Sequence, residues 1–157
     1  MDDAIFEKIY DETARPLWAF IARVSGDGGA ADDILQEAYL RFLRSPPREI
    51  SLVEAKPYLY KIATNLIYDR FRRLKRQGGT EVEISDLADT AGDKIEMGAE
   101  MMQVFSRLKQ QERSLLWLAY VEGYDHSEIA AIMKLNKLSV RVLMYRARQR
   151  LAKLLDG

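Results

Sequence analysis

The side chains with the clearest chemistry are the bases that crowd the end of the chain. Residues 137–157 hold six Lys or Arg against one acid. Apolar residues recur within this stretch at helical spacing, at Val140, Met144, Ala147 and Leu151. The bases between them must therefore lie on the outer surface of one helix. Because guanidinium groups form charge-assisted bonds to phosphate oxygens, this helix is predicted to bind nucleic acid.

The residues ahead of this helix predict a partner helix and a tight turn. A short apolar helix pattern over residues 129–133 is followed by a polar break at residues 134–137. Asp125 is a good N-cap for the first helix, and Asn136 is a good N-cap for the second. Two short helices joined by a tight turn, the second of them basic, indicate a helix-turn-helix reader of the DNA major groove.

Position along the second helix separates contacts with bases from contacts with phosphates. Residues just beyond the N-cap of a recognition helix point at base edges, whereas residues farther along suit the backbone. The candidates for base edges are Lys137, Ser139 and Arg141. The candidates for phosphates are Arg146, Arg148 and Arg150. The alternative is an ordinary helical bundle with a solvated basic face.

A second basic surface is predicted on a long helix over residues 58–76. Its buried stripe would be formed by Leu59, Ile62, Ala63, Leu66 and Ile67. Aromatic rings are interleaved there with bases and an amide: Tyr58, Tyr60, Lys61, Asn65, Tyr68, Arg70, Phe71, Arg72 and Arg73. Such a mixture suits single-stranded or melted DNA, because unpaired bases can stack on rings or enter pockets. The alternative is that the rings belong to the core and the charges only keep the helix soluble.

Further helical periods, with no strand pattern, make this an all-α prediction. These periods cover residues 4–24, 30–44 and 99–121. The glycine-rich stretch at 25–29 is expected to end the first helix, and Pro16 is expected to break or kink it. We expect the third period to be two helices that meet near residues 109–111.

The start of the middle helix is ambiguous from the sequence. Ser51 and Glu54 have the spacing of a capping box. Pro57 follows so closely that we place the helix start near Pro57, a residue suited to a first turn, and read residues 48–56 as a loop.

The net charge of zero conceals an alternation along the chain. Residues 41–76 carry a net charge of +7 and residues 137–157 carry +5. Residues 1–40 and 77–112 carry −6 and −5, respectively. Two separate basic surfaces indicate two contacts with a polyanion.

A change in composition divides the chain into two small helical domains, 1–76 and 99–157. Residues 77–98 hold four glycines and six acids against one Lys. Their periodicity is weak, which predicts a flexible acidic linker.

Composition excludes several classes of protein. The chain has no Cys and one His, which argues against disulfides and against a metal site. We find no paired carboxylates, nucleophile or phosphate-binding loop, and we therefore expect neither an enzyme nor a cofactor. The acidic N-terminus and the lack of a long apolar run predict a cytoplasmic protein without membrane insertion.

Three stretches, taken in order, resemble the bacterial extracytoplasmic-function (ECF) sigma factors, a class of RNA polymerase subunit. Region 2.2 of that family is resembled by DDILQEAYLRFLR. Regions 2.3 and 2.4 are resembled by PYLYKIATNLIYDRFRR. Region 4.2 is resembled by EGYDHSEIAAIMKLNKLSVRVLMYRARQRL. The resemblance covers nearly the whole chain and implies two helical domains that bind core polymerase and promoter DNA.

The resemblance also implies roles for particular residues. Without the resemblance, the acidic face of helix 30–44 would be read as a solvated surface. The resemblance implies that this face binds the clamp helices of the polymerase β′ subunit through Asp33, Gln36 and Glu37. Residues implied at the melted −10 element, with the loop at 50–56, are Tyr58, Lys61, Asn65, Arg70, Arg72, Arg73 and Arg76. Residues implied at the −35 element are Lys137, Ser139, Arg141, Tyr145, Arg146 and Arg148. Helices 99–121 would help to dock on the polymerase β flap, and an anti-sigma factor is an expected partner.

The chain departs from the family pattern at several positions. Lys109 and Lys134 stand where Pro and the turn Gly are usual. In the recognition helix, Leu138, Val142 and Leu143 replace the usual Gly, Ser and Arg. The face that should meet bases is therefore largely apolar, and it could contact thymine methyl groups, an anti-sigma partner or the first domain of the chain itself.

The sequence thus predicts a sigma factor that recognises −10 and −35 elements and stabilises the melted −10 strand. One alternative is a self-sufficient helix-turn-helix regulator that acts as a dimer on a palindromic operator. Another is a protein-interaction module of the same shape that sequesters a regulator.

Overall fold

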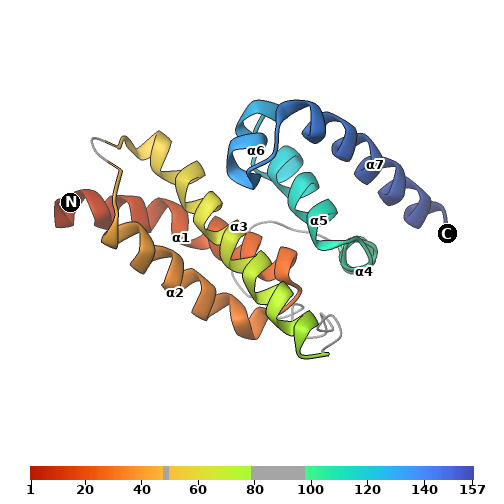
Figure 1. Ribbon diagram of the computed structural model, residues 1–157, viewed down its shortest axis with the longest axis horizontal. Coiled ribbons are helices and arrows are strands. Elements are labelled where there is room, and N and C mark those ends of the chain that lie inside the picture. The colour runs from red at the N-terminus through yellow and green to blue at the C-terminus, as the bar shows by residue number, and fades with distance from the viewer. Residues whose placement is uncertain (48–49, 79–97) are drawn as a thin grey trace.

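The chain is built entirely from helices in the part that the structure describes. The computed structural model describes residues 1–47, 50–78 and 98–157, and no strand occurs among them. The predicted all-α fold is therefore confirmed. The elements, in order, are α1 (Asp3–Ser25), α2 (Gly28–Arg44), α3 (Leu52–Arg76), α4 (Ala99–Ser106), α5 (Gln110–Leu116), the π-helical turn η2 (Trp117–Val121), α6 (His126–Met133) and α7 (Lys137–Asp156) (Figure 1).

Helices α1 and α2 form a hairpin whose tight turn follows from two residues. Gly26 ends α1 in the left-handed conformation, with φ of 74°, which glycine adopts without steric cost. Asp27 then caps α2 by accepting hydrogen bonds from the backbone N–H groups of Gly29 and Ala30. Pro16 lies within α1, so the expected break does not occur. The carbonyl that Pro16 leaves without a helical partner belongs to Glu12, an exposed residue whose backbone can bind water.

The start of α3 differs from the prediction. The helix begins at Leu52, and the Ser51 side chain caps it by accepting a hydrogen bond from Glu54 N–H at 3.2 Å. The capping pattern was thus the correct signal, and the placement of the start near Pro57 was wrong. Pro57 removes only the helical bond to the carbonyl of Val53, and Val53 is 83% exposed, so water can replace that bond.

One apolar core joins the first three helices. Its largest fully buried members include Leu17, Phe20, Phe42 and Leu59. Alanines occupy the same interfaces on all three helices and let the helix axes approach closely: Ala19, Ala22, Ala38, Ala55 and Ala63. The bundle fixes the positions of α2 and α3, which carry two of the candidate surfaces.

The second half of the chain confirms the predicted division of residues 99–121. Helix α4 ends at Ser106 and α5 begins at Gln110. Lys109 takes the N-cap position, and its N–H donates to the Glu112 carboxylate at 2.8 Å. Glu112 thus satisfies the first free N–H of α5, where the positive end of the helix dipole also favours a carboxylate.

The tight turn between α6 and α7 contains a strained residue. Lys134 has φ of 56° and ψ of 45°, and it is the non-glycine residue with positive φ among those described. A side chain in this left-handed region costs roughly 1–2 kcal/mol. Lys134, at the position where the resemblance implied a turn glycine, therefore destabilises the turn between α6 and α7.

Replacing Lys134 with Gly is expected to stabilise the chain by about 0.5–1 kcal/mol, since relief of strain exceeds the added freedom of the unfolded chain. Chemical denaturation of both proteins measures the difference. Lys153→Gly, at an exposed and helical position, is the matched control and is expected to destabilise by a similar amount. Destabilisation by Lys134→Gly would contradict the assignment of strain.

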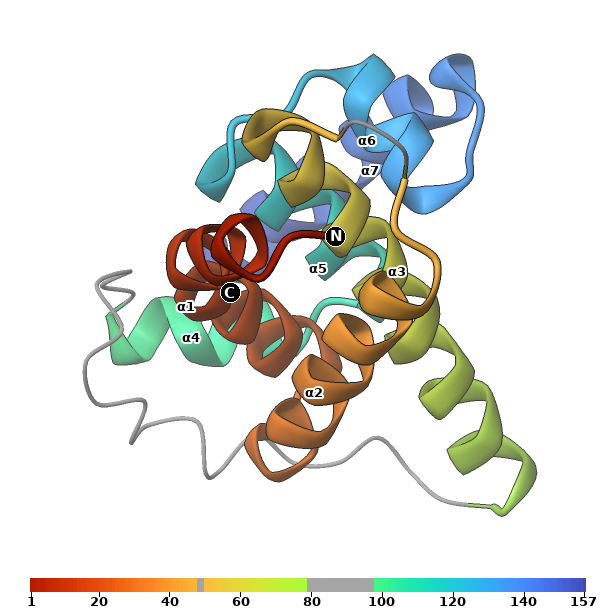
Figure 2. The same cartoon turned by 90° about the vertical axis from the view of Figure 1, so that its left-hand side faces the viewer.

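The two halves of the chain pack against each other along α3. Helix α3 lies between α2 on one side and the α5–α6 pair on the other (Figures 1 and 2). The Glu122 side chain is 5% exposed. It accepts a hydrogen bond from the Tyr60 hydroxyl at 2.8 Å and forms an ion pair with Lys56 at 3.3 Å. On the other flank, Arg113 of α5 donates to the Val24 carbonyl near the end of α1 at 2.9 Å. A buried charge on each flank thus joins the halves.

Burial perturbs several tyrosines, Tyr60 and Tyr124 at this interface and Tyr39 between α1 and α2. Burial, with a further contribution from the Glu122 carboxylate, raises the pKa of Tyr60 well above its usual value of 10.0. Burial also raises the pKa of Tyr39 and of Tyr124 to about 12. In the unfolded chain these phenols ionise near pH 10, before the folded ones do. The unfolded state then releases protons, so stability present below pH 10 falls as the pH rises toward 12.

Tyr60→Phe is expected to flatten this alkaline loss of stability, because it removes one of the phenols that must stay protonated in the folded chain. At pH 8 the variant should be less stable by about 1.5–3 kcal/mol, since the Glu122 carboxylate loses a donor. Denaturation at a series of pH values between 8 and 12 tests both effects. Tyr120→Phe, at a position 65% exposed, is the control and should keep the wild-type slope. An unchanged slope in Tyr60→Phe would contradict the role of burial.

The predicted acidic linker lies outside the described residues except at its two ends, residues 77–78 and residue 98. Its flexibility and the domain boundaries at residues 76 and 99 stay predictions.

Candidate nucleic-acid interface

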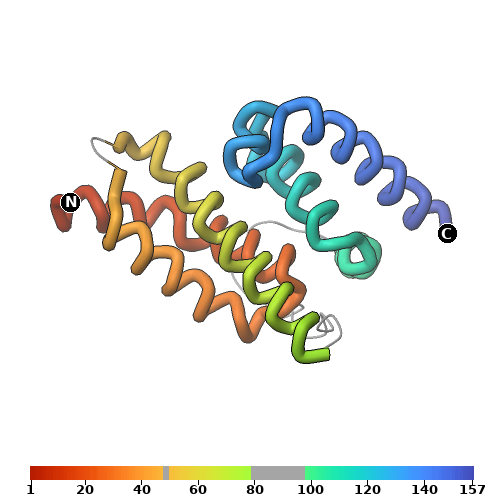
Figure 3. The backbone as a smooth tube through the Cα atoms, viewed as in Figure 1, coloured from red at the N-terminus to blue at the C-terminus, as the bar shows by residue number. Residues whose placement is uncertain are grey.

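The start of the recognition helix is fixed by its cap. The Asn136 side chain accepts a hydrogen bond from Ser139 N–H at 2.7 Å, as predicted. Asp125 caps α6 in the same way, accepting from Glu128 N–H at 2.8 Å. Helix α7 runs along the outer edge of the molecule, away from α1 and α2 (Figure 3). Its first turns are therefore open to an incoming duplex.

The predicted −35 residues of α7 gather on its outward side. Ser139 is half-buried, and the others are exposed: Lys137, Arg141, Tyr145, Arg146 and Arg148. No ion pair joins Lys137, Arg141 or Arg146 to another residue in the described part of the chain. Their charges are thus available to phosphates or bases, although their contact with DNA stays a prediction.

Two arginines of α7 already have partners within the chain. Arg150 pairs with Glu112 at 3.4 Å, which holds α7 against the start of α5. Arg148 donates to the Tyr120 hydroxyl at 3.4 Å. Arg150 therefore has a structural role in this arrangement, beside the phosphate contact that was predicted for it.

The apolar face of α7 is uncovered. Leu138 is 74% exposed, Tyr145 56% and Val142 49%. The first three helices do not cover this face, so packing against the chain's own first domain does not explain it in this structure. Leu143, by contrast, packs against the core and belongs to the opposite side of the helix.

Helix α3 presents three distinct sides. Leu59 and Ala63 face the core of the first half. Tyr60 faces Glu122. The third side is half-exposed and carries the predicted −10 residues Tyr58, Lys61 and Asn65.

Rings on α3 therefore serve both of the roles that the sequence left open. Tyr60 is wholly buried against Phe20 and Tyr124, which is the core interpretation. Tyr58 is half-buried, with its ring centroid 5.9 Å from that of Phe42. Tyr58 is thus held in position while part of its ring remains open to a base.

The C-terminal end of α3 carries the predicted backbone-binding arginines. Arg72, Arg73 and Arg76 are exposed, and Arg72 forms an ion pair with Asp69 one turn earlier. The last turn of the helix is also its negative end, so bases placed there stabilise it. A phosphate backbone that passes this end would meet a cluster of exposed guanidinium groups, one of which pairs with Asp69.

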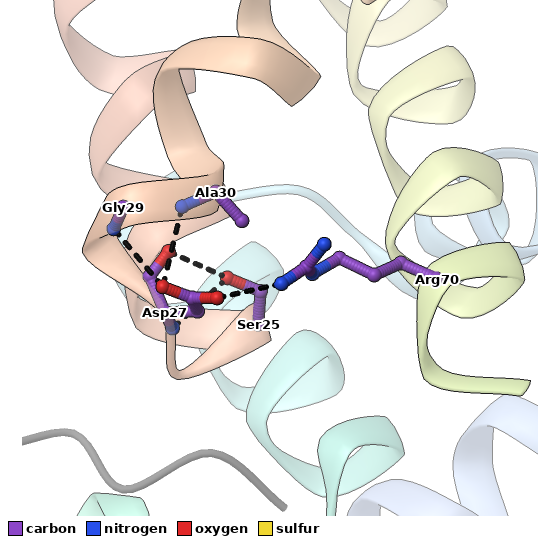
Figure 4. Close-up of polar contacts among 5 residues, drawn as sticks. All are labelled: Ser25, Asp27, Gly29, Ala30 and Arg70. Carbon is purple, nitrogen blue, oxygen red and sulfur yellow. Dashed lines mark hydrogen bonds and ion pairs between the residues drawn. The ribbon is translucent and has the colours of Figure 1, made fainter. Parts of the chain in front are cut away.

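Arg70 differs from the other arginines. Its guanidinium donates to the Asp27 carboxylate at 2.7 Å, while the other oxygen of Asp27 caps α2 (Figure 4). The Ser25 hydroxyl lies beside the same turn and binds the backbone of Asp27. Arg70 thus fastens α3 to the α1–α2 turn in this structure, and its contact with DNA stays a prediction.

The predicted polymerase-binding residues lie together on α2. Asp33 and Gln36 are exposed. Glu37 is half-buried and forms ion pairs with Arg41 at 3.2 Å and Arg44 at 3.9 Å. Their grouping on one side of α2 could be predicted from the sequence, because they are spaced as in a helix and the buried residues lie on the opposite side.

Sequence reasoning missed an apolar component of this surface. Leu40 and Leu43 are 42% and 43% exposed, and with Gln36 they line a shallow groove between α1 and α2. Their position on the outward side of the helix was readable from the spacing of the buried residues. The surface is thus acidic at one end and apolar at the other.

Neither a metal site nor a membrane span occurs in the described residues. They contain no group of His, Cys, Asp and Glu side chains that could hold a metal ion. None of their helices has both the length and the apolar character needed to cross a membrane.

Two protein families match successive parts of the chain. Sigma-70 region 2 matches residues 9–77, and sigma-70 region 4 matches residues 99–151. The chain is 27% identical over 156 residues to the ECF RNA polymerase sigma factor SigL of Mycobacterium tuberculosis, covering 92% of this chain and 85% of SigL. It is 27% identical over 155 residues to SigM of Bacillus subtilis, covering 92% and 91% of the two chains.

Solved structures share the fold. The sigma factor RpoE of Bartonella quintana, in complex with the anti-sigma factor NepR, superposes with a TM-score of 0.77 at 22% identity and covers 96% of both chains. CnrH, in complex with the cytosolic domain of CnrY, gives a TM-score of 0.68 at 21% identity, covering 99% of this chain and 90% of CnrH.

Proposed function

Because the chain belongs to the ECF RNA polymerase sigma factors, which direct transcription initiation, we propose a division of labour among three of its helices. Helix α2 docks on the β′ clamp helices of core polymerase. Helix α3 holds the melted −10 strand, and α7 reads the −35 element. Every one of these roles is a binding role, and none requires catalysis.

The observation that carries this proposal is the separation of three open surfaces on different helices of the chain. The acidic and apolar surface of α2, the half-exposed ring and amide side of α3 and the basic side of α7 do not overlap. A protein that binds polymerase and two DNA elements at once needs such separate surfaces. Basic side chains supply affinity for the backbone, and the local contacts supply sequence choice.

The partners follow from the same surfaces. Core polymerase is contacted through Asp33, Gln36 and Glu37, and the helices from α4 to η2 dock on the β flap. An anti-sigma factor is a further proposed partner, and the complexes of RpoE with NepR and of CnrH with CnrY support this proposal.

Run-off transcription with purified core polymerase tests the function. We expect the full chain to direct initiation from discrete start sites on genomic DNA, where core polymerase alone gives none. The mass of the chain in solution is measured in parallel. A dimer that binds DNA tightly without polymerase, and that directs no transcription, would favour the self-sufficient regulator instead.

A further inference from the structure

An apolar stripe on α7 lies between two basic edges. Leu138, Val142 and Tyr145 follow one another at spacings of four and three residues, so they share one side of the helix. All three are exposed. One edge of the stripe carries Lys137, Arg141 and Arg148, and the other edge carries Arg146. The first turns of this surface are therefore apolar along their centre and cationic along both sides, and the exposed Gln149 continues the same side beyond Tyr145, to whose hydroxyl it donates.

This arrangement matches the cross-section of a DNA major groove. A recognition helix lies in the groove with its central residues against base edges and its flanks near the two phosphate backbones. The basic edges of α7 can then reach phosphates on both sides. The stripe begins two residues after the cap at Asn136, in the part of the helix that points at bases.

The chemistry of the stripe selects one kind of base. Leu138 and Val142 offer neither a donor nor an acceptor, so they cannot pair with the polar groups of any base edge. Thymine alone presents a methyl group in the major groove. Burying that methyl against Leu138 and Val142 removes apolar surface from water on both molecules.

Resting on the proposed function, we infer that Leu138 and Val142 read thymine in the upstream promoter element through its C5 methyl group. The two side chains lie about 6 Å apart along the helix axis, four residues at 1.5 Å each. Successive base pairs are about 3.4 Å apart, so this separation spans about two base-pair steps, and the two side chains contact thymines within two base pairs of each other. Arg141, on the adjacent edge, is placed to pair with a guanine O6 and N7 beside them.

The charge pattern favours DNA over a protein as the occupant. An interface with a protein partner typically has few charges at its centre and a mixed polar rim. Here each edge of the stripe is cationic, and no described acid pairs with Lys137, Arg141 or Arg146. Uniform positive charge on both sides is the complement of two phosphate backbones.

The test changes the DNA before it changes the protein. Upstream elements are first selected from a randomised duplex by run-off transcription with the full chain and core polymerase. We expect the selected element to hold thymine. Each thymine is then replaced by deoxyuridine, which lacks only the methyl group. Each contacted thymine should lose about fourfold in promoter binding at fixed salt when replaced.

Matched variants connect that loss to α7. Leu138→Ala with Val142→Ala removes both contacts, so it should lose on the order of 16-fold on the thymine duplex, the product of two fourfold losses. It should bind the thymine and deoxyuridine duplexes equally. Leu155→Ala is the control, since Leu155 is 47% exposed near the end of the same helix, and it should keep the wild-type sensitivity. Thermal unfolding checks that the exposed substitutions leave the fold intact.

Three results would overturn the inference. One is a selected element without thymine, and another is equal binding of thymine and deoxyuridine duplexes by the unaltered chain. The third is a double variant that still discriminates between thymine and deoxyuridine as the unaltered chain does. If that variant instead lost binding to a protein partner, the apolar stripe would be a protein-binding surface, which also contradicts the inference. In each of these cases, start-site-specific transcription would persist if the proposed function is correct, whereas its absence would refute that function instead.

Discussion

Reversing the charge at Asp33 and Glu37, by substituting Lys for both, is expected to weaken binding to core RNA polymerase by on the order of a hundredfold. Like charges set against each other across an interface cost several kcal/mol. The change also removes the carboxylate that now pairs with Arg41 and Arg44. One face of α2 would then carry four neighbouring cations where the unaltered helix carries two acids and two cations.

A fluorescence titration of labelled chain with core polymerase measures this affinity at two salt concentrations. Glu7→Lys with Asp11→Lys is the matched control, because it makes the same change in charge at exposed positions of α1. The control should bind as the unaltered chain does. Unchanged affinity in the α2 variant would remove Asp33 and Glu37 from the polymerase interface.

The sequence predicted the elements of the candidate site well where the determining interactions are local. The caps at Asp125 and Asn136 join groups three residues apart, so the residue types alone indicate them. The left-handed backbone at Lys134 occurs at the position where the family resemblance implied a turn glycine. The placement of the start of α3 was wrong because two local signals, Ser51 and Pro57, disagreed and the weaker of them was followed.

Contacts between distant parts of the chain were beyond such reasoning. Glu122 belongs to a motif whose resemblance concerns DNA, yet its side chain is buried against Tyr60 and Lys56 of α3. The hydrogen bond from Arg113 to the Val24 carbonyl spans 89 positions. No spacing in the sequence indicates such pairs, because they depend on how the two halves pack.

The packing of α3 explains why its composition was ambiguous. An ordinary amphipathic helix has one buried stripe, whereas α3 contacts α1, α2 and α6. Tyr60 belongs to the core and Tyr58 to the half-exposed side, although the two residues are only two positions apart in the sequence. Each class of residue on α3 therefore has a distinct place, and the bases at its C-terminal end remain the most open to DNA.

Alanine at both Arg72 and Arg73 is expected to reduce promoter opening by about 30-fold while binding to core polymerase persists. Each exposed guanidinium that contacts a phosphate contributes roughly 1 kcal/mol or more, as a hydrogen bond to a charged group. Two lost contacts should also reduce the slope of log affinity against log salt by about 2. The ion pair between Arg72 and Asp69 lies within one helix and is solvent-exposed, so its loss should change folding stability little.

Permanganate footprinting of the melted strand and titration with core polymerase separate opening from docking in this variant. Lys8→Ala with Arg15→Ala removes the same charge from exposed positions of α1 and serves as the control. A loss of opening without loss of docking would place the DNA-binding surface at the end of α3, apart from the polymerase surface of α2. Equal opening by the Arg72 and Arg73 variant would instead leave α7 as the site of the main DNA contact, since its cationic edges are the other basic surface that the structure presents.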